Sequence, residues 1–172
     1  LFLSVLGGVI AQVPVGFMSD RFDRRIVLIL LSIFAFMVCF CFSVVKEPSL
    51  NILYILSFFF GMFTFPIFSV SSAHANDFVT GDDFINLASS HIFIYSIGAI
   101  SSPFIGSLIM ENFGSAALFS LIGIAHIILI VFGLIRMISR PSPNLRTPYS
   151  YIARTSFVLE KIMGRKKYKN EK

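Results

Sequence analysis

Apolar residues in this chain are grouped into long blocks, separated by short polar segments. Each block approaches or exceeds the roughly 20 residues that a helix needs to cross the hydrocarbon core of a bilayer. Runs such as Ile26 to Leu31 and Ile127 to Leu134 do not alternate between apolar and polar residues, as barrel strands would. Because lipid offers the backbone no hydrogen-bond partners, each block is predicted to be a membrane-spanning helix.

Five such helices can be placed, and the connections between them are short. Short connections make consecutive helices antiparallel neighbours in a bundle. The expected fold class is therefore an all-α membrane protein, a polytopic helical bundle with a membrane domain over residues 1–138. The spans are expected at residues 1–18, 26–45, 51–75, 84–110 and 114–136.

The last part of the chain, residues 139–172, is polar and basic and is expected to form a tail outside the bilayer. Pro148 and Gly164 frame a possible amphipathic helix over 148–163, with a proline in its first turn and a glycine after its end. Such a helix would lie on the membrane surface, where each basic residue near anionic lipid gains about 1 kcal/mol. A disordered basic tail is the alternative, and the sequence leaves both open.

Composition agrees with a membrane protein. Hydrophobic residues make up 56% of the 172 residues and charged residues 13%, whereas soluble domains carry about 25% charged residues. Cys39 and Cys41 lie two apart within one block, where they face different sides of a helix and form no disulfide. The first residue is Leu1 rather than Met, so we expect the sequence to begin inside a larger protein.

The distribution of basic residues predicts the orientation. Five alternating crossings place the segments 19–25 and 76–83 and the tail on one side of the membrane. Of the 14 lysines and arginines, all except Lys46 lie on that side. The positive-inside rule therefore predicts that the 19–25 turn and the C-terminus are cytoplasmic.

The turn between the first two spans carries the most specific pattern. Gly16 removes side-chain bulk where two helices could touch. Asp20 can accept hydrogen bonds at the positive N-terminal end of a nearby helix. Arg21, Arg24 and Arg25 can hold carboxylates or lipid phosphates through bidentate contacts.

These residues resemble the signature loop of the major facilitator superfamily, which reads approximately G-x-x-x-D-R-x-G-R-R. The one departure is Asp23, which stands where the family usually has glycine. This aspartate, together with Gln12, Pro14 and Ser19, resembles instead a poorly characterised bacterial branch of the family, whose loop reads Q-x-P-x-G-x-x-S-D-R-x-D-R-R. The gating-loop positions that match or depart in this way are Gly16, Asp20, Arg21, Asp23, Arg24 and Arg25.

The resemblance implies a twelve-helix fold in which this loop occurs between spans 2 and 3 and again between spans 8 and 9. Because three spans follow the loop's second helix, the chain is expected to be the C-terminal part, spans 8 to 12. Gly98, Pro103 and Gly106 resemble the small-residue and proline pattern of span 11 and are expected in helix packing. The implied function is secondary active transport of a small solute by alternating access in the plasma membrane, for this branch the bacterial inner membrane. The expected partners are the solute, the bilayer and the missing N-terminal half of the carrier.

Polar residues are concentrated in the third and fourth spans, at helical spacing, whereas the second and fifth spans carry few. Such residues face the bundle interior or a watery cavity, and the family likewise places spans 10 and 11 at its central cavity. Serine and threonine can instead bond to their own backbone, and Tyr54 could be an interfacial anchor. The expected substrate-cavity residues are Tyr54, Ser57, Thr64, His91, Tyr95 and Ser102.

The charged turn suggests a latch between helices. We expect Arg24 or Arg25 to reach the acidic 76–83 segment and Asp20 to lie near the N-terminus of the fourth span. These contacts would hold the carrier closed to the cytoplasm. A solvated turn that serves only orientation is the alternative.

Other classes of function find less support in the sequence. An enzyme would need convergent acids, a metal cluster or a nucleophile with its base, and no catalytic residue, metal site or cofactor is predicted. Nucleic-acid binding is not expected, because the net charge of +5 reflects the tail and the orientation bias. A membrane anchor or receptor without transport activity remains the alternative function.

Overall fold

The computed structural model describes residues 1–45, 48–79 and 83–139, and almost all of them are helical. All five helices are long and apolar enough to span a membrane, which confirms the predicted helical membrane bundle. Several helices extend a few residues past the expected spans. The possible helix over 148–163 lies outside the described residues. The helices are α1 (Phe2–Arg21), α2 (Arg24–Val44), α3 (Leu50–Asn76), α4 (Asp83–Phe113) and α5 (Ser115–Ser139).

Two tight connections are determined by individual residues. Between α1 and α2, Phe22 is extended and the Asp23 side chain caps α2 by accepting a hydrogen bond from the Arg25 backbone N–H at 3.0 Å. Between α4 and α5, Gly114 has a φ of 84°, which a residue with a side chain rarely adopts. Both connections are too short for anything but antiparallel neighbours.

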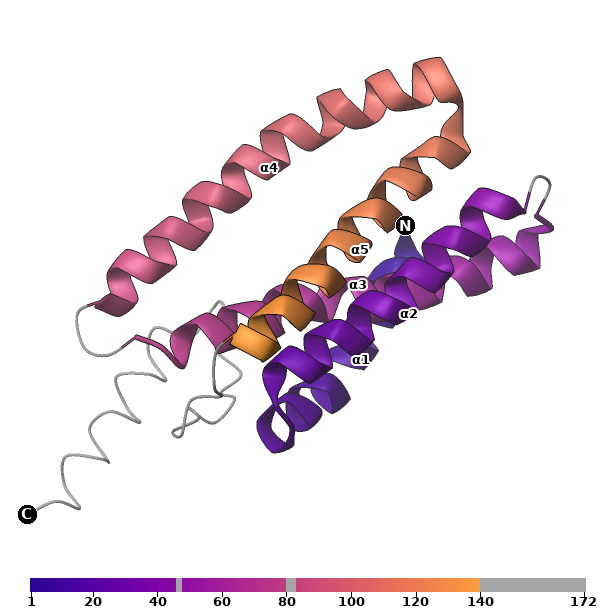
Figure 1. The fold of residues 1–172 in the computed structure, drawn as a ribbon. Helices are drawn as coiled ribbons and strands as arrows, with labels where there is room; N and C mark the ends of the chain where they lie inside the picture. The colour runs from indigo at the N-terminus through magenta and orange to yellow at the C-terminus, as the bar shows by residue number, and fades with distance from the viewer. Residues whose placement is uncertain (46–47, 80–82, 140–172) are drawn as a thin grey trace, which may run out of the picture.

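The bundle is built around α3 and α2. Helix α1 packs along α3, whereas α2 packs against both α3 and α5. Helix α4 is joined to α5 at one end, where the two pack against each other, and it has only sparse contact with α3 (Figure 1). The buried apolar core lies between α1, α2 and α3 and contains Ala11, Val15, Val27, Leu31 and Val70.

The backbones of α1 and α3 approach closely where they cross. A Cβ atom at Gly7 would overlap the Phe58 carbonyl oxygen, and one at Gly61 would overlap the Ser4 carbonyl oxygen. Small residues permit such contact in membrane bundles. The sequence analysis did not identify this crossing, although Gly7-Gly8 in the first span was a usable signal.

The start of α2 and the ends of α3 and α5 lie together at one end of the bundle. Arg24 bonds to the Ala73 carbonyl oxygen at 2.5 Å, and Arg25 to the Arg136 carbonyl oxygen at 3.4 Å. These contacts agree with five alternating crossings, which place the 19–25 turn, the end of α3 and the end of α5 on one side. We call this region, which also contains Asp77, the charged end.

Candidate functional site

Arg24 joins three helices at the charged end. Its guanidinium lies 2.6 Å from Asp77 Oδ1 at the end of α3 and 3.5 Å from Asp20 Oδ1 in α1. The side chains of Arg24 and Asp77 are each 2% exposed. The prediction that Arg24 or Arg25 reaches the 76–83 segment is therefore confirmed.

The position of Asp77 explains why it needs a cation. Asp77 is the C-cap of α3, and the C-terminal end of a helix carries partial negative charge that disfavours an acid. Arg24 donates hydrogen bonds to both the Asp77 carboxylate and the Ala73 carbonyl oxygen, and its positive charge offsets the negative charge at this helix end. Removing one partner of a buried ion pair typically costs about 3–5 kcal/mol, because the other charge stays buried.

Arg25 forms a local pair instead. Its Nε and Nη2 donate to the two carboxylate oxygens of Asp23 at 3.2 and 2.8 Å. Asp23 thus both caps α2 and orients Arg25 toward α5. This dual contact gives a physical role to the acid that stands where the signature loop usually has glycine.

The remaining residues of the loop differ in exposure. Gly16 is buried, as expected for a close helix contact, and Arg21 is exposed. The expected position of Asp20 near the N-terminus of α4 stays a prediction, because residues 80–82, which precede that helix, lie outside the described residues. Asp20 lies one turn from Arg24 across the tight α1–α2 connection.

The expected cavity residues are only partly brought together. Phe68 of α3 contacts both the His91 ring, at a centroid distance of 6.5 Å, and the Tyr95 ring, at 5.9 Å. Thr64 Oγ1, one turn earlier in α3, is buried and has no hydrogen-bond partner among the described residues. Ser57 is partly buried, whereas Tyr54 is exposed. Their role in binding a substrate stays a prediction.

Ser102 belongs to another part of α4. Together with Pro103 and Gly106, it lines a cavity of about 450 Å³ between α4 and α5. A Cβ atom at Gly106 would meet Leu118 of α5 at 3.3 Å, whereas one at Gly98 would meet nothing within 4 Å in the described residues. Gly106 is thus placed at a helix contact, and the packing role of Gly98 stays a prediction.

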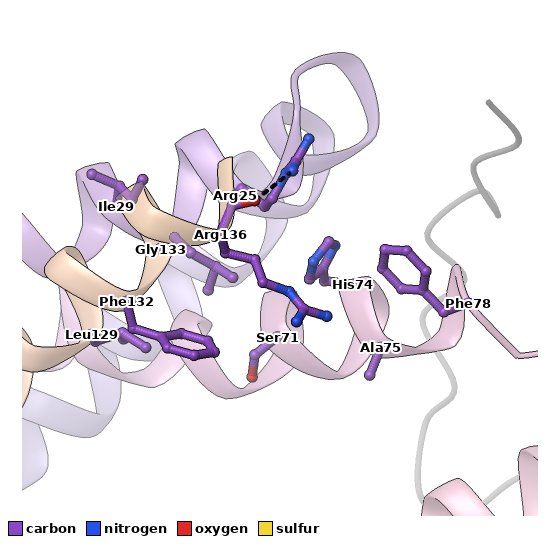
Figure 2. A pocket seen from close by; sticks show the side chains of 11 residues that line it. Arg25, Ile29, Ser71, His74, Ala75, Phe78, Leu129, Phe132, Gly133 and Arg136 are labelled. Carbon is purple, nitrogen blue, oxygen red and sulfur yellow. Dashed lines mark hydrogen bonds between the residues drawn. The ribbon is translucent and has the colours of Figure 1, made fainter. Parts of the chain in front are cut away.

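A second cavity, of about 320 Å³, lies at the charged end between α2, α3 and α5 (Figure 2). Its polar lining consists of Arg25, Ser71, His74 and Arg136, and the rest is mostly apolar. The sequence analysis missed it, because Arg136 was used only as an orientation signal. Within the described parts of the chain, no group of three or more His, Cys, Asp or Glu could hold a metal ion.

Fold and charged end together define a polytopic helical membrane protein whose helices are tied at one end by buried ion pairs. The chain matches the family model of the Major Facilitator Superfamily over residues 1–168, and it belongs to that family.

Curated relatives agree with this assignment. An "Uncharacterized MFS-type transporter" of Yersinia pestis (strain Pestoides F) is 27% identical over 154 residues, which cover 87% of this chain and 37% of the relative. An "Uncharacterized MFS-type transporter" of Yersinia enterocolitica is 30% identical over the same coverage. The chain thus spans about 37% of the length of the curated relatives it matches. No solved structure matches.

Proposed function

We propose that this chain is part of a secondary active transporter that moves a small solute by alternating access, and that its helices correspond to spans 8 to 12. Family membership and the names of the relatives support transport rather than a membrane anchor or an enzyme. The fraction of the relatives that the chain covers is close to that of five spans in twelve. The remaining spans of the same carrier are then its main partner, and no nucleic acid or cofactor takes part.

The observation that carries the proposal is the buried pair between Arg24 and Asp77, with Asp20 beside it. Carriers of this kind alternate by rocking two halves about a site near the membrane midplane. The positive-inside rule places the charged end in the cytoplasm of a bacterial inner membrane. The pair then acts as a latch that stabilises the state closed to the cytoplasm and is broken when the carrier opens inward.

The solute is expected to contact the polar face of α3 and α4. On this proposal His91 and Tyr95, together at Phe68, border the path of the solute. Neutral hydroxyl and ring groups suit an uncharged or weakly charged metabolite. The candidate residues are Tyr54, Ser57, Thr64, His91, Tyr95 and Ser102.

Cysteine accessibility tests the latch without knowledge of the solute. In the full-length carrier with Cys39 and Cys41 replaced by alanine, Tyr95→Cys would be labelled with an impermeant maleimide in inside-out vesicles. Asp77→Asn is expected to raise the labelling rate about tenfold or more, because a loss of 1.4 kcal/mol shifts an equilibrium tenfold.

Arg21→Gln is the matched control, because Arg21 comes from the same turn but is exposed. It should leave the labelling rate unchanged. Equal rates in Asp77→Asn and the unmodified carrier, with both proteins folded, would reject the latch. A membrane anchor that does not alternate would show that same result.

A further inference from the structure

The cavity at the charged end contains a guanidinium that has no acidic partner among the described residues. Arg136 lies in the last turn of α5, and Figure 2 shows its side chain inside the cavity, with the guanidinium between Ser71 and His74. No hydrogen bond or ion pair of this side chain occurs within the described residues. Arg25, by contrast, is held by both carboxylate oxygens of Asp23.

The lining has one charged edge and one apolar wall. Arg25 and Arg136 are its charged residues, His74 and Ser71 add hydrogen-bonding groups, and none of its described lining residues is acidic. The carboxylates of Asp23 and Asp77, which lie at the same end of the bundle, are bonded to Arg25 and Arg24. The apolar wall comes from α2 and α5 and contains Leu28, Ile29, Leu129, Phe132 and Gly133.

Such an arrangement favours an anion with an apolar extension. A guanidinium among apolar groups is unfavourable unless it is paired and hydrogen-bonded. Arg25, His74 and Arg136 all lie in terminal turns of membrane-length helices, which is the depth of lipid headgroups. Basic pockets between helices on the cytoplasmic side of membrane proteins are suited to anionic headgroups.

We propose that this cavity binds an anionic phospholipid. The phosphate lies on Arg136, with His74 as a further donor, and the first part of an acyl chain lies along Leu129 and Phe132. The Ser71 hydroxyl donates to the Phe68 carbonyl oxygen at 3.2 Å and is not counted among the donors. A volume of about 320 Å³ holds a phosphate with a short length of chain rather than a whole lipid. Bound there, the lipid joins α5 to α3 at the charged end, in addition to the direct contact between the Phe119 ring of α5 and the Phe60 ring of α3, whose centroids are 6.0 Å apart.

Two other occupants are less suited to the cavity. A free phosphate would gain from Arg136 but would leave the apolar wall uncovered. A transported solute is expected near the membrane midplane, whereas this cavity lies at the helix ends. The lipid proposal does not depend on transport, so it can succeed or fail separately from the latch.

A tryptophan reporter tests the proposal in the full-length carrier. The 172 residues contain no tryptophan, so Phe132→Trp places the single tryptophan of this segment on the apolar wall. The full-length protein without this substitution gives the fluorescence background from the other spans. Its fluorescence is measured in phosphatidylcholine vesicles that contain equal fractions of brominated phosphatidylglycerol or brominated phosphatidylcholine. From the quenching, the relative binding constant of brominated phosphatidylglycerol is expected to be about fivefold that of brominated phosphatidylcholine, because one basic residue near anionic lipid contributes about 1 kcal/mol.

Charge variants decide whether Arg136 is responsible. In Phe132→Trp with Arg136→Gln, the preference for phosphatidylglycerol should fall to about one, whereas Arg136→Lys should retain much of it and Arg21→Gln all of it. A preference that survives Arg136→Gln overturns the proposal, as does equal quenching by both lipids in Phe132→Trp alone. Loss of the preference on addition of millimolar glycerol phosphate assigns the site to a free anion and also overturns it.

Discussion

The region where α1, α2 and α3 meet and the long helix α4 use small and polar residues in opposite ways. In the first region, Gly7 and Gly61 bring two backbones into contact, and the Arg24–Asp77 pair is buried. Helix α4 also carries small and polar residues. Only 6% of the residues in its apolar 18-residue stretch are buried, however, compared with 33% in the corresponding stretch of α1. A Cβ atom at Gly98 would meet no other part of the described residues within 4 Å.

This difference separates two uses of polarity in a membrane helix. Polar groups in hydrocarbon must be satisfied by protein or face water. In α1 to α3 some polar groups bond across helices, as in the hydrogen bond from Gln12 to Ser69 at 2.7 Å, although Thr64 Oγ1 has no partner among the described residues. On α4 the serines that are bonded, such as Ser90 and Ser96, bond to their own helix. We therefore propose that the open face of α4 borders the solute path.

The largest effect is expected from inserting a side chain where the backbones of α1 and α3 are in contact. Gly61→Leu places a side chain where the Ser4 carbonyl oxygen lies, and overpacking against backbone should cost about 3 kcal/mol or more. We expect almost no folded carrier, measured as the monodisperse fraction in size-exclusion chromatography after mild detergent extraction.

Gly98→Leu is the matched substitution in α4. Because a Cβ atom there meets nothing within 4 Å in the described residues, the variant should fold and instead reduce labelling of Tyr95→Cys from the cytoplasmic side. If both leucine variants prevented folding equally, the contrast between α1–α3 and α4 would be lost.

Breaking the interhelical ion pair is expected to have the next largest effect. Asp77→Asn leaves Arg24 buried with Asp20 at 3.5 Å, so the loss should be about 2–3 kcal/mol, below the usual cost for a fully orphaned charge. A double-mutant cycle with Arg24→Gln, measured by thermal melting in detergent, should give a coupling of about 1 kcal/mol or more. Additive losses would mean that the two side chains do not interact.

The sequence predicted those features that depend on composition and charge spacing. Hydrophobic length alone predicted five spans, because lipid leaves the backbone no alternative to a helix. The pattern of arginines after Gly16 and the aspartates of 76–83 predicted that Arg24 or Arg25 reaches the acidic segment, because opposite charges on one side of a membrane can be satisfied by each other. The structure identifies the pair as Arg24 and Asp77.

Features that depend on which helices touch were not predictable in the same way. Among the described residues α1 packs along α3 and not against α4, and nothing in the sequence indicated this choice of neighbour. The crossing at Gly7 and Gly61 and the cavity at Arg136 require knowledge of interhelical distance and side-chain direction. A single sequence gives the periodicity of each helix but not which neighbour its face meets.

A smaller effect is expected at the local pair of the charged end. Asp23→Ala removes the cap of α2, where Oδ1 accepts the Arg25 N–H at 3.0 Å, and loss of such a cap costs about 1 kcal/mol. Asp23→Asn keeps an acceptor oxygen and should lose less. The comparison is made by thermal melting, and a loss in Asp23→Ala as large as that in Asp77→Asn would remove the distinction between local and interhelical pairs.

The smallest effect is expected where α2 and α5 pack through mainly apolar surfaces. Ser120 donates a hydrogen bond to Ser43 Oγ at 3.0 Å across these helices, next to the stacked rings of Phe42 and Phe119. Hydrogen bonds between membrane helices contribute about 0.6 kcal/mol on average, so Ser120→Ala should lower stability by about that amount. Ser139→Ala is the control, because the Ser139 hydroxyl bonds, within the described residues, to the Ile135 carbonyl oxygen of its own helix. A loss in Ser120→Ala no larger than in the control would mean that ring stacking and apolar contact alone hold α2 to α5, whereas α1 and α3 need their glycines and polar pairs.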